Sequence, residues 1–172
     1  MHEVITVQKF SENEWLLDGI LEGNQNAQNV VIMLHEGGYN RDENGLFPVI
    51  EGSAIKKENN KIIFQTKNYG NYEILTNSLI KNDEFATFRY DLRNHGKSLV
   101  NDKMDKRDTL YMRLAKDLRD VIKYLKNKYS FKKIYFIGTG IGALVIEYYL
   151  TKINDIPLND IKQIHLICPN SP

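Results

Sequence analysis

The residues whose spacing most directly suggests chemistry are the alternating glycines of "FIGTGIGALV", residues 136–145. They stand between an apolar run and an amphipathic run, where a strand turns into a helix. Gly138, Gly140 and Ala143 fit G-x-G-x-x-G/A, in which glycine backbone approaches a pyrophosphate at a helix N-terminus. The same stretch fits G-x-S-x-G, a turn that presents a nucleophilic serine, with Gly140 in place of the serine. The two patterns predict different functions.

The dinucleotide pattern lacks its supporting context. It requires an acidic residue about 20 residues further on, at the end of the next strand, to hold a ribose hydroxyl. The next apolar run ends in "HLICPN", residues 165–170, which contains neither Asp nor Glu. The pattern also normally opens its domain, whereas here most of the sequence precedes it. A Rossmann-type nucleotide-binding module is therefore kept only as a second alternative.

The elements that must position these glycines can be inferred from apolar periodicity. "NVVIML" (29–34) is a continuous apolar run rich in β-branched residues, which predicts a strand buried on both faces. Strands and helices alternate from there on, which predicts an α/β fold: a mostly parallel sheet with helices on both faces. The expected strands are 3–8, 14–23, 29–34, 60–66, 84–91, 132–138 and a last buried strand at 161–168, and the expected helices are 71–82, 110–125 and 141–153.

Three segments in this order resemble the α/β-hydrolase superfamily, in its serine aminopeptidase, esterase or thioesterase-like branch. "VVIMLHEGG" (30–38) looks like the strand and His-Gly loop that form half of an oxyanion hole. "FRYDLRNHGKS" (88–98) resembles the motif Tyr-Asp-x-Arg-Gly-His-Gly-x-Ser, and "KKIYFIGTGIGA" (132–143) falls where the nucleophile elbow belongs. The resemblance covers roughly residues 14 to 170. It implies an α/β-hydrolase-like domain that lacks the last βα units at its C-terminus.

The resemblance also implies roles for particular positions. In the family a serine attacks a carbonyl, a histidine activates the serine, an acid orients the histidine, and two backbone N–H groups hold the oxyanion. Carried onto this sequence, the nucleophile position is Gly140, and the oxyanion donors are the N–H groups of Gly37 and Ile141. The triad acid and histidine follow two further strands in the family, so the sequence as given has neither. Because loss of the nucleophile alone costs about 10⁶ in rate in subtilisin, we expect no serine-hydrolase activity.

Other polar residues near these motifs have alternative interpretations. Thr139 is expected to point away from the pocket, and Ser98 is expected to close or cap a loop rather than act as a nucleophile. His35 and His95 are expected to organise the backbone of their loops. Glu36 stands where the His-Gly pair has its glycine. Its carboxylate opposes a developing oxyanion if it points inward and does not if it points to solvent, and the sequence leaves both orientations open.

The remaining histidines and the single cysteine suggest no metal or cofactor chemistry. His2 lies at the N-terminus, His165 lies within a predicted strand, and no spacing among the four histidines suggests a metal site. Cys168, at a strand end, is expected to be a small core residue rather than a reactive thiol. We therefore expect no cofactor.

The composition narrows the classes of partner. Lys and Arg number 23 against 22 Asp and Glu, so nothing in the charge balance favours nucleic acid or a membrane surface as partner. No apolar run reaches the roughly 18 residues that span a bilayer, and the N-terminus lacks a signal-peptide pattern. These features predict a cytoplasmic protein with one domain, 1–172, in which 41–68 forms an insert or flap.

Three functions remain open from the sequence. The first is a non-catalytic binding protein, or pseudo-hydrolase, with a small acyl compound as candidate ligand. The second is the N-terminal part of a truncated, split or mutated acyl hydrolase, whose apolar last strand would be an open sheet edge. A homodimer mate or a second chain could cover that edge. The third is the nucleotide-binding module.

Overall fold

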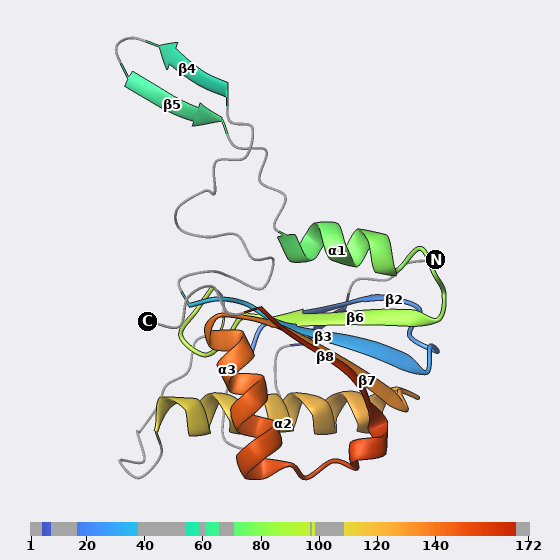
Figure 1. Ribbon diagram of the computed structural model, residues 1–172. Helices are drawn as coiled ribbons and strands as arrows, with labels where there is room; N and C mark the ends of the chain where they lie inside the picture. Colours follow the sequence, from blue (N-terminus) through green and yellow to red (C-terminus); the bar gives the residue numbers. More distant parts are fainter. Residues whose placement is uncertain are drawn as a thin grey trace.

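The computed structural model describes residues 17–37, 72–96, 98 and 109–167 with their side chains, and residues 5–7, 54–58, 61–65 and 71 by their backbone. Six strands form one sheet in the spatial order β1-β2-β6-β3-β7-β8 (Figure 1). The pairs β3–β6, β3–β7 and β7–β8 are parallel, and the pairs β1–β2 and β2–β6 are antiparallel. The strands are β1 (Ile5–Val7), β2 (Gly19–Gly23), β3 (Asn29–Leu34), β6 (Phe85–Tyr90), β7 (Lys133–Thr139) and β8 (Ile161–Ile167).

Helices cover both faces of this sheet. α1 (Asn71–Leu79) lies on one face, and α2 (Leu110–Lys128) and α3 (Ile141–Tyr148) lie on the other (Figure 1). The predicted mostly parallel sheet with helices on both faces is therefore confirmed. The predicted helix 141–153 is shorter than expected, because after α3 the chain continues as a π-helical turn, Tyr149–Ile153, and then a 3₁₀ turn, Leu158–Asp160.

The central strand β3 is buried on both faces, as its composition predicts. Val30, Ile32 and Leu34 belong to the main core between the sheet and the helices α2 and α3. Val31 and Met33 alternate with them and belong to a smaller core under α1. A strand with helices over both faces has no need of polar alternation, which explains the continuous apolar run.

The helix α2 is amphipathic in the way that its sequence predicts. Thr109 caps the helix, and its side chain accepts a hydrogen bond from the N–H of Met112 at 3.3 Å. The sequence places leucine, valine and isoleucine at helical spacing along one side of this helix, and the first of them, Leu110, is half exposed. The rest of the stripe is buried: Leu114, Leu118, Val121, Ile122 and Leu125.

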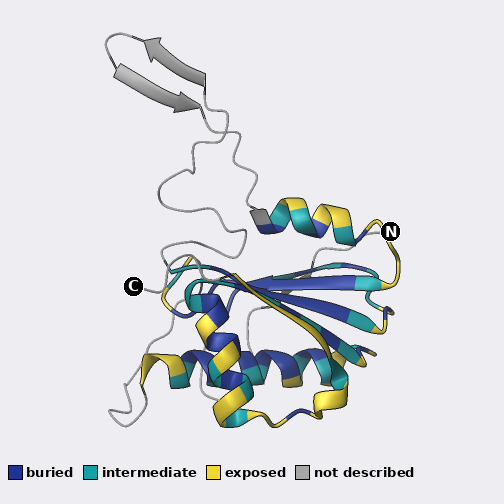
Figure 2. Cartoon of the chain, in the orientation of Figure 1, coloured by how far each residue is buried: buried dark blue, intermediate teal, exposed yellow. Residues whose placement is uncertain are grey.

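The last strand corrects the sequence analysis. β8 was expected to be buried, but it lies at the edge of the sheet and six of its seven residues are exposed. Figure 2 shows it as a mostly exposed ribbon beside the buried strands at the centre of the sheet. Although β8 is rich in apolar residues, the described residues leave most of it exposed.

A separate hairpin lies within the segment predicted to be an insert. β4 (Ala54–Glu58) and β5 (Lys61–Gln65) pair with each other as an antiparallel two-stranded sheet. The strand predicted at 60–66 is thereby confirmed. The rest of 41–68 lies outside the described residues, so its role as an insert or flap stays a prediction.

Candidate functional site

The turn between β7 and α3 has the sharp geometry that the glycine pattern suggests. Gly140, which precedes the first residue of α3, has φ 46° and ψ −113°, a conformation that residues with a side chain rarely adopt. Its N–H donates to the carbonyl of Ile167, at the end of β8, at 2.9 Å. The turn is thus held at the ends of two parallel strands, although the role of Gly140 as a nucleophile position stays a prediction.

The two flanking glycines serve close packing rather than access for a ligand. A Cβ atom on Gly138 would lie 2.7 Å from the backbone nitrogen of Ala143, closer than real Cβ atoms approach. A Cβ atom on Gly142 would overlap the carbonyl of Leu34 at the end of β3. Both positions need glycine because α3 begins directly against the strand ends. The close packing at Gly142 also brings its N–H to the carbonyl of His35, at 3.2 Å.

The side chain of Glu36 points inward, which decides the orientation that the sequence leaves open. A Cβ atom on Gly140 would overlap the carboxylate of Glu36, with both oxygens and the carboxyl carbon inside contact distance. The N–H of Gly37 donates to Oε1 of the same carboxylate at 3.1 Å. The carboxylate therefore lies directly over Gly140, in the space that any side chain at position 140 would enter.

The two positions expected to donate to an oxyanion lie side by side. A Cβ atom on Gly37 would lie 2.5 Å from Cδ1 of Ile141, so the loop after β3 contacts the first residue of α3. The structure thus brings Gly37, Gly140 and Ile141 together, as the resemblance implies. Because the Gly37 N–H is already donated to Glu36, the role of these positions as an oxyanion hole stays a prediction.

His35 holds the backbone of this loop. The ring is fully buried, its Nδ1 lies 2.7 Å from the carbonyl of Glu36, and its Nε2 lies 2.9 Å from the N–H of Leu92. Both contacts are satisfied by a neutral ring that carries its proton on Nδ1. Burial lowers the pKa of His35 to about 4, although the hydrogen bond to Glu36 acts in the opposite direction. His35 therefore organises backbone, as predicted, and has no free nitrogen for acid-base chemistry.

The loop after β6 is closed by Ser98. Its hydroxyl donates to the carbonyl of Asp91 at 2.5 Å and accepts from the N–H of Asp18 at 2.9 Å, and the residue is fully buried. Asn94 has φ 61° where the family motif has glycine, which is the left-handed region that Asn tolerates best among larger residues. The expectation that Ser98 closes a loop is confirmed.

A buried ion pair fixes the same loop to α2. Nε and Nη2 of Arg93 donate to the two carboxylate oxygens of Asp117 at 2.8 and 2.7 Å, and both side chains are almost fully buried. The neighbouring His95 packs edge-on against the ring of His35, with 5.3 Å between centroids, and its Nδ1 lies 3.0 Å from the carbonyl of Arg93. His95 therefore also organises its loop. The loops after β3 and β6 form one connected polar network.

Thr139 is turned towards α1. The hydroxyl of Tyr72 on α1 donates to the carbonyl of Leu34 at 2.8 Å and lies 3.3 Å from Oγ1 of Thr139. This contact is on the α1 face of the sheet, and the expectation that Thr139 points away from a pocket at the turn stays a prediction. The sequence gives no signal for this role of Tyr72, because an aromatic residue at the start of an amphipathic helix is typical of a core position.

The remaining candidate residues lie on β8 or outside the described residues. His165 is exposed on β8, and His2 and Cys168 lie outside the described residues. Among the residues that the structure describes, no group of three or more His, Cys, Asp or Glu could hold a metal ion. None of the described helices is both long and apolar enough to cross a bilayer.

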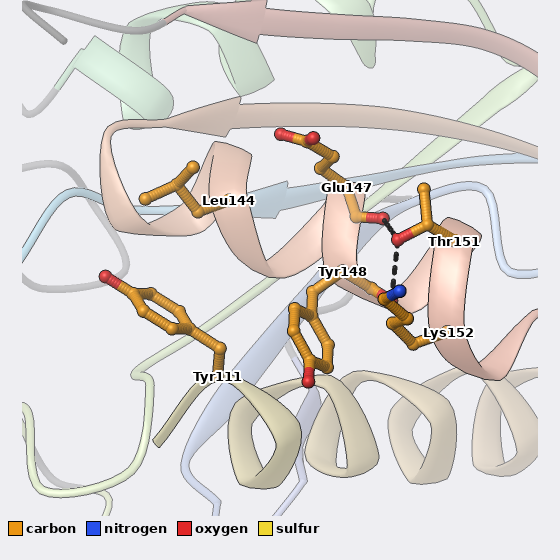
Figure 3. Close-up of a pocket in the computed structure, with 6 residues that line it drawn as sticks. All are labelled: Tyr111, Leu144, Glu147, Tyr148, Thr151 and Lys152. Atoms are coloured by element: carbon orange, nitrogen blue, oxygen red, sulfur yellow. Dashed lines mark hydrogen bonds between the residues drawn. The ribbon is translucent and has the colours of Figure 1, made fainter. Parts of the chain in front are cut away.

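A shallow depression of about 270 Å³ lies on the surface of α2 and α3. Its lining combines two tyrosine rings with the exposed side of α3 (Figure 3). The Thr151 hydroxyl, in the turn that follows α3, donates to the carbonyl of Glu147 at 2.9 Å. The lining residues are Tyr111, Leu144, Glu147, Tyr148, Thr151 and Lys152.

Comparison with solved structures shows that the fold is that of α/β-hydrolases. An esterase from Pyrococcus furiosus is 23% identical with a TM-score of 0.61, over 90% of this chain and 49% of the esterase. A 2-hydroxy-6-oxo-6-phenylhexa-2,4-dienoate hydrolase from Rhodococcus sp. strain RHA1 is 15% identical with a TM-score of 0.59, over 100% of this chain and 49% of that one. An alpha/beta hydrolase from Novosphingobium aromaticivorans is 15% identical with a TM-score of 0.62, over 96% and 44%.

These likenesses extend to the fold alone, and the chain spans about half the length of the structures that it matches. No curated protein matches the chain. A protein family described as "Alpha/beta hydrolase of unknown function (DUF915)" matches residues 20–164, a stretch that includes both loops and the turn at Gly140. The chain belongs to this family of α/β-hydrolases.

Proposed function

We propose that this chain is a non-catalytic α/β-hydrolase, a pseudo-hydrolase that acts by binding, in which Glu36 fills the position of a missing nucleophile. The observation that carries the proposal is the carboxylate of Glu36 lying over Gly140. Gly140 has the backbone geometry of an elbow but no side chain. The space that a serine would need is filled by the chain itself.

Electrostatics supports the same conclusion. Acyl transfer requires N–H donors aimed at an oxygen that becomes negative in the transition state. Here the Gly37 N–H is donated to a carboxylate. A second negative charge about 4 Å away would be repelled by about 4 kcal/mol at an effective dielectric constant of about 20. Glu36 therefore counts against an oxyanion at this position.

The same carboxylate counts against the nucleotide-binding alternative. A pyrophosphate at G-x-G-x-x-A needs open backbone N–H groups and a positive helix N-terminus. At the start of α3 the space over Gly140 holds a carboxylate instead. An uncharged ligand suits a site beside this carboxylate better than an anion does. A small neutral acyl compound meets that condition.

One observation favours a second candidate function, the N-terminal part of an acyl hydrolase. Between 90% and 100% of this chain matches solved hydrolases, but only 44–49% of each hydrolase is covered. A triad acid and histidine would then come from sequence beyond residue 172. Gly140 would still lack a nucleophilic side chain, so this candidate requires a different nucleophile or a different reaction.

The test is covalent labelling of the purified chain with a fluorophosphonate, together with hydrolysis of 4-nitrophenyl acetate. The proposal predicts no stoichiometric label and no hydrolysis beyond that of the heat-unfolded chain. Glu36→Gln is the matched variant, because it keeps the shape of the side chain and removes its charge, and we expect it to be equally inactive. Stoichiometric labelling of the folded wild type at a single residue, lost on unfolding, would contradict the proposal.

A further inference from the structure

The carboxylate of Glu36 is held by the chain in the way that a ligand would be held. It fills the space over Gly140, where a Cβ atom would overlap both of its oxygens and its carboxyl carbon. Its Oε1 accepts the N–H of Gly37 at 3.1 Å, and a hydrogen bond to an ionised acceptor is stronger than one between neutral groups. This space, bounded by Gly37, Gly140 and Ile141, is called the carboxylate seat below.

The carboxylate seat suits a negatively charged oxygen. Gly140 directly precedes Ile141, the first residue of α3, so the carboxylate lies beside the end of the helix that carries partial positive charge. The loop after β3 closes the other side, because a Cβ atom on Gly37 would lie 2.5 Å from Cδ1 of Ile141. These features act on any carboxylate or carbonyl oxygen of suitable size, and they are not specific to a side chain of the chain itself.

The seat and its occupant come from different loops. Glu36 follows β3, and Gly140 lies in the turn between β7 and α3 with φ 46°. Glycine at position 140 leaves the space open, and the side chain at position 36 enters it. Glu36, Gly37 and Gly140 are each only partly buried, so a molecule from solvent can approach the same place.

We propose that Glu36 makes an autoinhibitory contact: its carboxylate is the internal ligand of the carboxylate seat. The oxygen of a small acyl compound reaches the Gly37 N–H only when the Glu36 side chain leaves the seat. A tethered group competes as if it were present at millimolar concentration or above, so a weak ligand is excluded from the wild type. This inference rests on the ligand class proposed above, and it adds that binding is coupled to movement of Glu36.

The inference predicts a binding property that appears when the side chain is cut back. Acetate has the same terminal group as the side chain of Glu36 and is small enough to take its place. Glu36→Ala removes the internal ligand and leaves the Gly37 N–H and the start of α3 unchanged. The variant should therefore bind free acetate at the place that the wild type fills with its own carboxylate.

The experiment titrates the wild type and Glu36→Ala with sodium acetate, with sodium chloride added to keep the ionic strength constant. Binding is followed by the amide NMR signals of Gly37 and Ile141. We expect saturable shifts with a Kd of about 10 mM in Glu36→Ala, and binding at least about tenfold weaker in the wild type. The readout is binding and not labelling or hydrolysis, so its failure is distinguishable from failure of the pseudo-hydrolase proposal.

Glu147→Ala is the matched control. It also removes one carboxylate from α3 and its surroundings, but Glu147 is exposed and lines the depression in Figure 3 rather than the carboxylate seat. The change in net charge is the same in both variants, so a general loss of repulsion would act on both. Glu147→Ala should bind acetate as weakly as the wild type does.

A measurement on the wild type needs no variant. If the Glu36 carboxylate is seated in solution, hydrogen exchange of the Gly37 amide is slower than the intrinsic rate of an unprotected glycine amide by at least about tenfold. Urea denaturation shows whether Glu36→Ala is folded, and the exchange rate remains decisive if it is not. Exchange at the intrinsic rate would mean that the carboxylate is not seated and would overturn the proposal.

Two results of the titration would also overturn it. The first is the absence of saturable shifts at Gly37 and Ile141 in folded Glu36→Ala up to about 300 mM acetate, a concentration well above the expected Kd. The second is equal acetate affinity in Glu36→Ala and in the wild type or Glu147→Ala, because Glu36 would then not be the competitor.

Discussion

The loops after β3 and β6 and the turn between β7 and α3 lie at the carboxyl ends of neighbouring parallel strands. They differ in which features of the family motifs they retain. In the two loops, polar groups of the family motifs keep structural partners, as with His35 on Leu92 and Ser98 on Asp91. At the turn, the backbone is shaped as an elbow, yet Gly140 has no side chain and Glu36 covers it. The comparison teaches that the polar contacts of the loops are made beside a turn whose central residue has no side chain.

The largest effect should come from breaking the loop network at its buried ion pair. Asp117→Ala leaves the Arg93 guanidinium buried without the carboxylate that accepts its two hydrogen bonds. We expect a loss of about 3–5 kcal/mol in the free energy of unfolding, measured by urea denaturation. A loss below about 1 kcal/mol would mean that the network is not what holds the loop.

The next effect is a pH dependence that originates at His35. Its pKa is lowered to about 4 in the folded state, from 6.5 for the unperturbed group, mainly by burial. The unfolded chain therefore binds more protons between these values, so stability is complete above about pH 6.5 and falls as the pH drops towards 4. The total loss is about 3 kcal/mol, at about 1.4 kcal/mol per pKa unit.

The measurement is urea denaturation from pH 7 to pH 4 for the wild type and for His35→Gln. The variant cannot titrate at this position, so its stability should fall less over the same interval, although it starts lower. Parallel curves for the two proteins would show that another group causes the dependence.

A smaller effect should follow removal of the Ser98 hydroxyl. Ser98→Ala leaves the carbonyl of Asp91 and the N–H of Asp18 without this partner in a buried place. We expect a loss of about 2 kcal/mol in unfolding free energy, with no change in labelling by a fluorophosphonate. Ser78→Ala, on the exposed side of α1, is the matched control and should change stability by less than about 0.5 kcal/mol.

Much of the fold and part of the site could be predicted from the sequence. The uninterrupted apolar run of β3 indicates burial on both faces, and the alternation of elements indicates a parallel sheet. The alternating glycines predict a strand that turns into a helix, and the structure has this turn between β7 and α3. Local patterns succeed in these cases because the physical cause is itself local or periodic.

Other features could not be read in this way. The inward orientation of Glu36 depends on Gly140, a residue far away in the sequence, which leaves the space that the carboxylate enters. The apolar composition of β8 predicts a buried strand, but the strand is exposed. Composition indicates that a strand is suited to burial and does not identify the segment that covers it. α3 ends at Tyr148 and continues as a π-helical turn, a change of helix type that apolar periodicity does not report.

The central claim, that Glu36 occupies the space of a side chain at position 140, is tested most directly by a double-mutant cycle. Gly140→Ser, Glu36→Gly and the double variant are compared with the wild type by urea denaturation. The account predicts that Gly140→Ser destabilises the wild type more than it destabilises the Glu36→Gly protein, with a coupling free energy of about 1–2 kcal/mol. Additive effects, with a coupling below about 0.3 kcal/mol, would mean that Glu36 does not fill that space and would contradict the account.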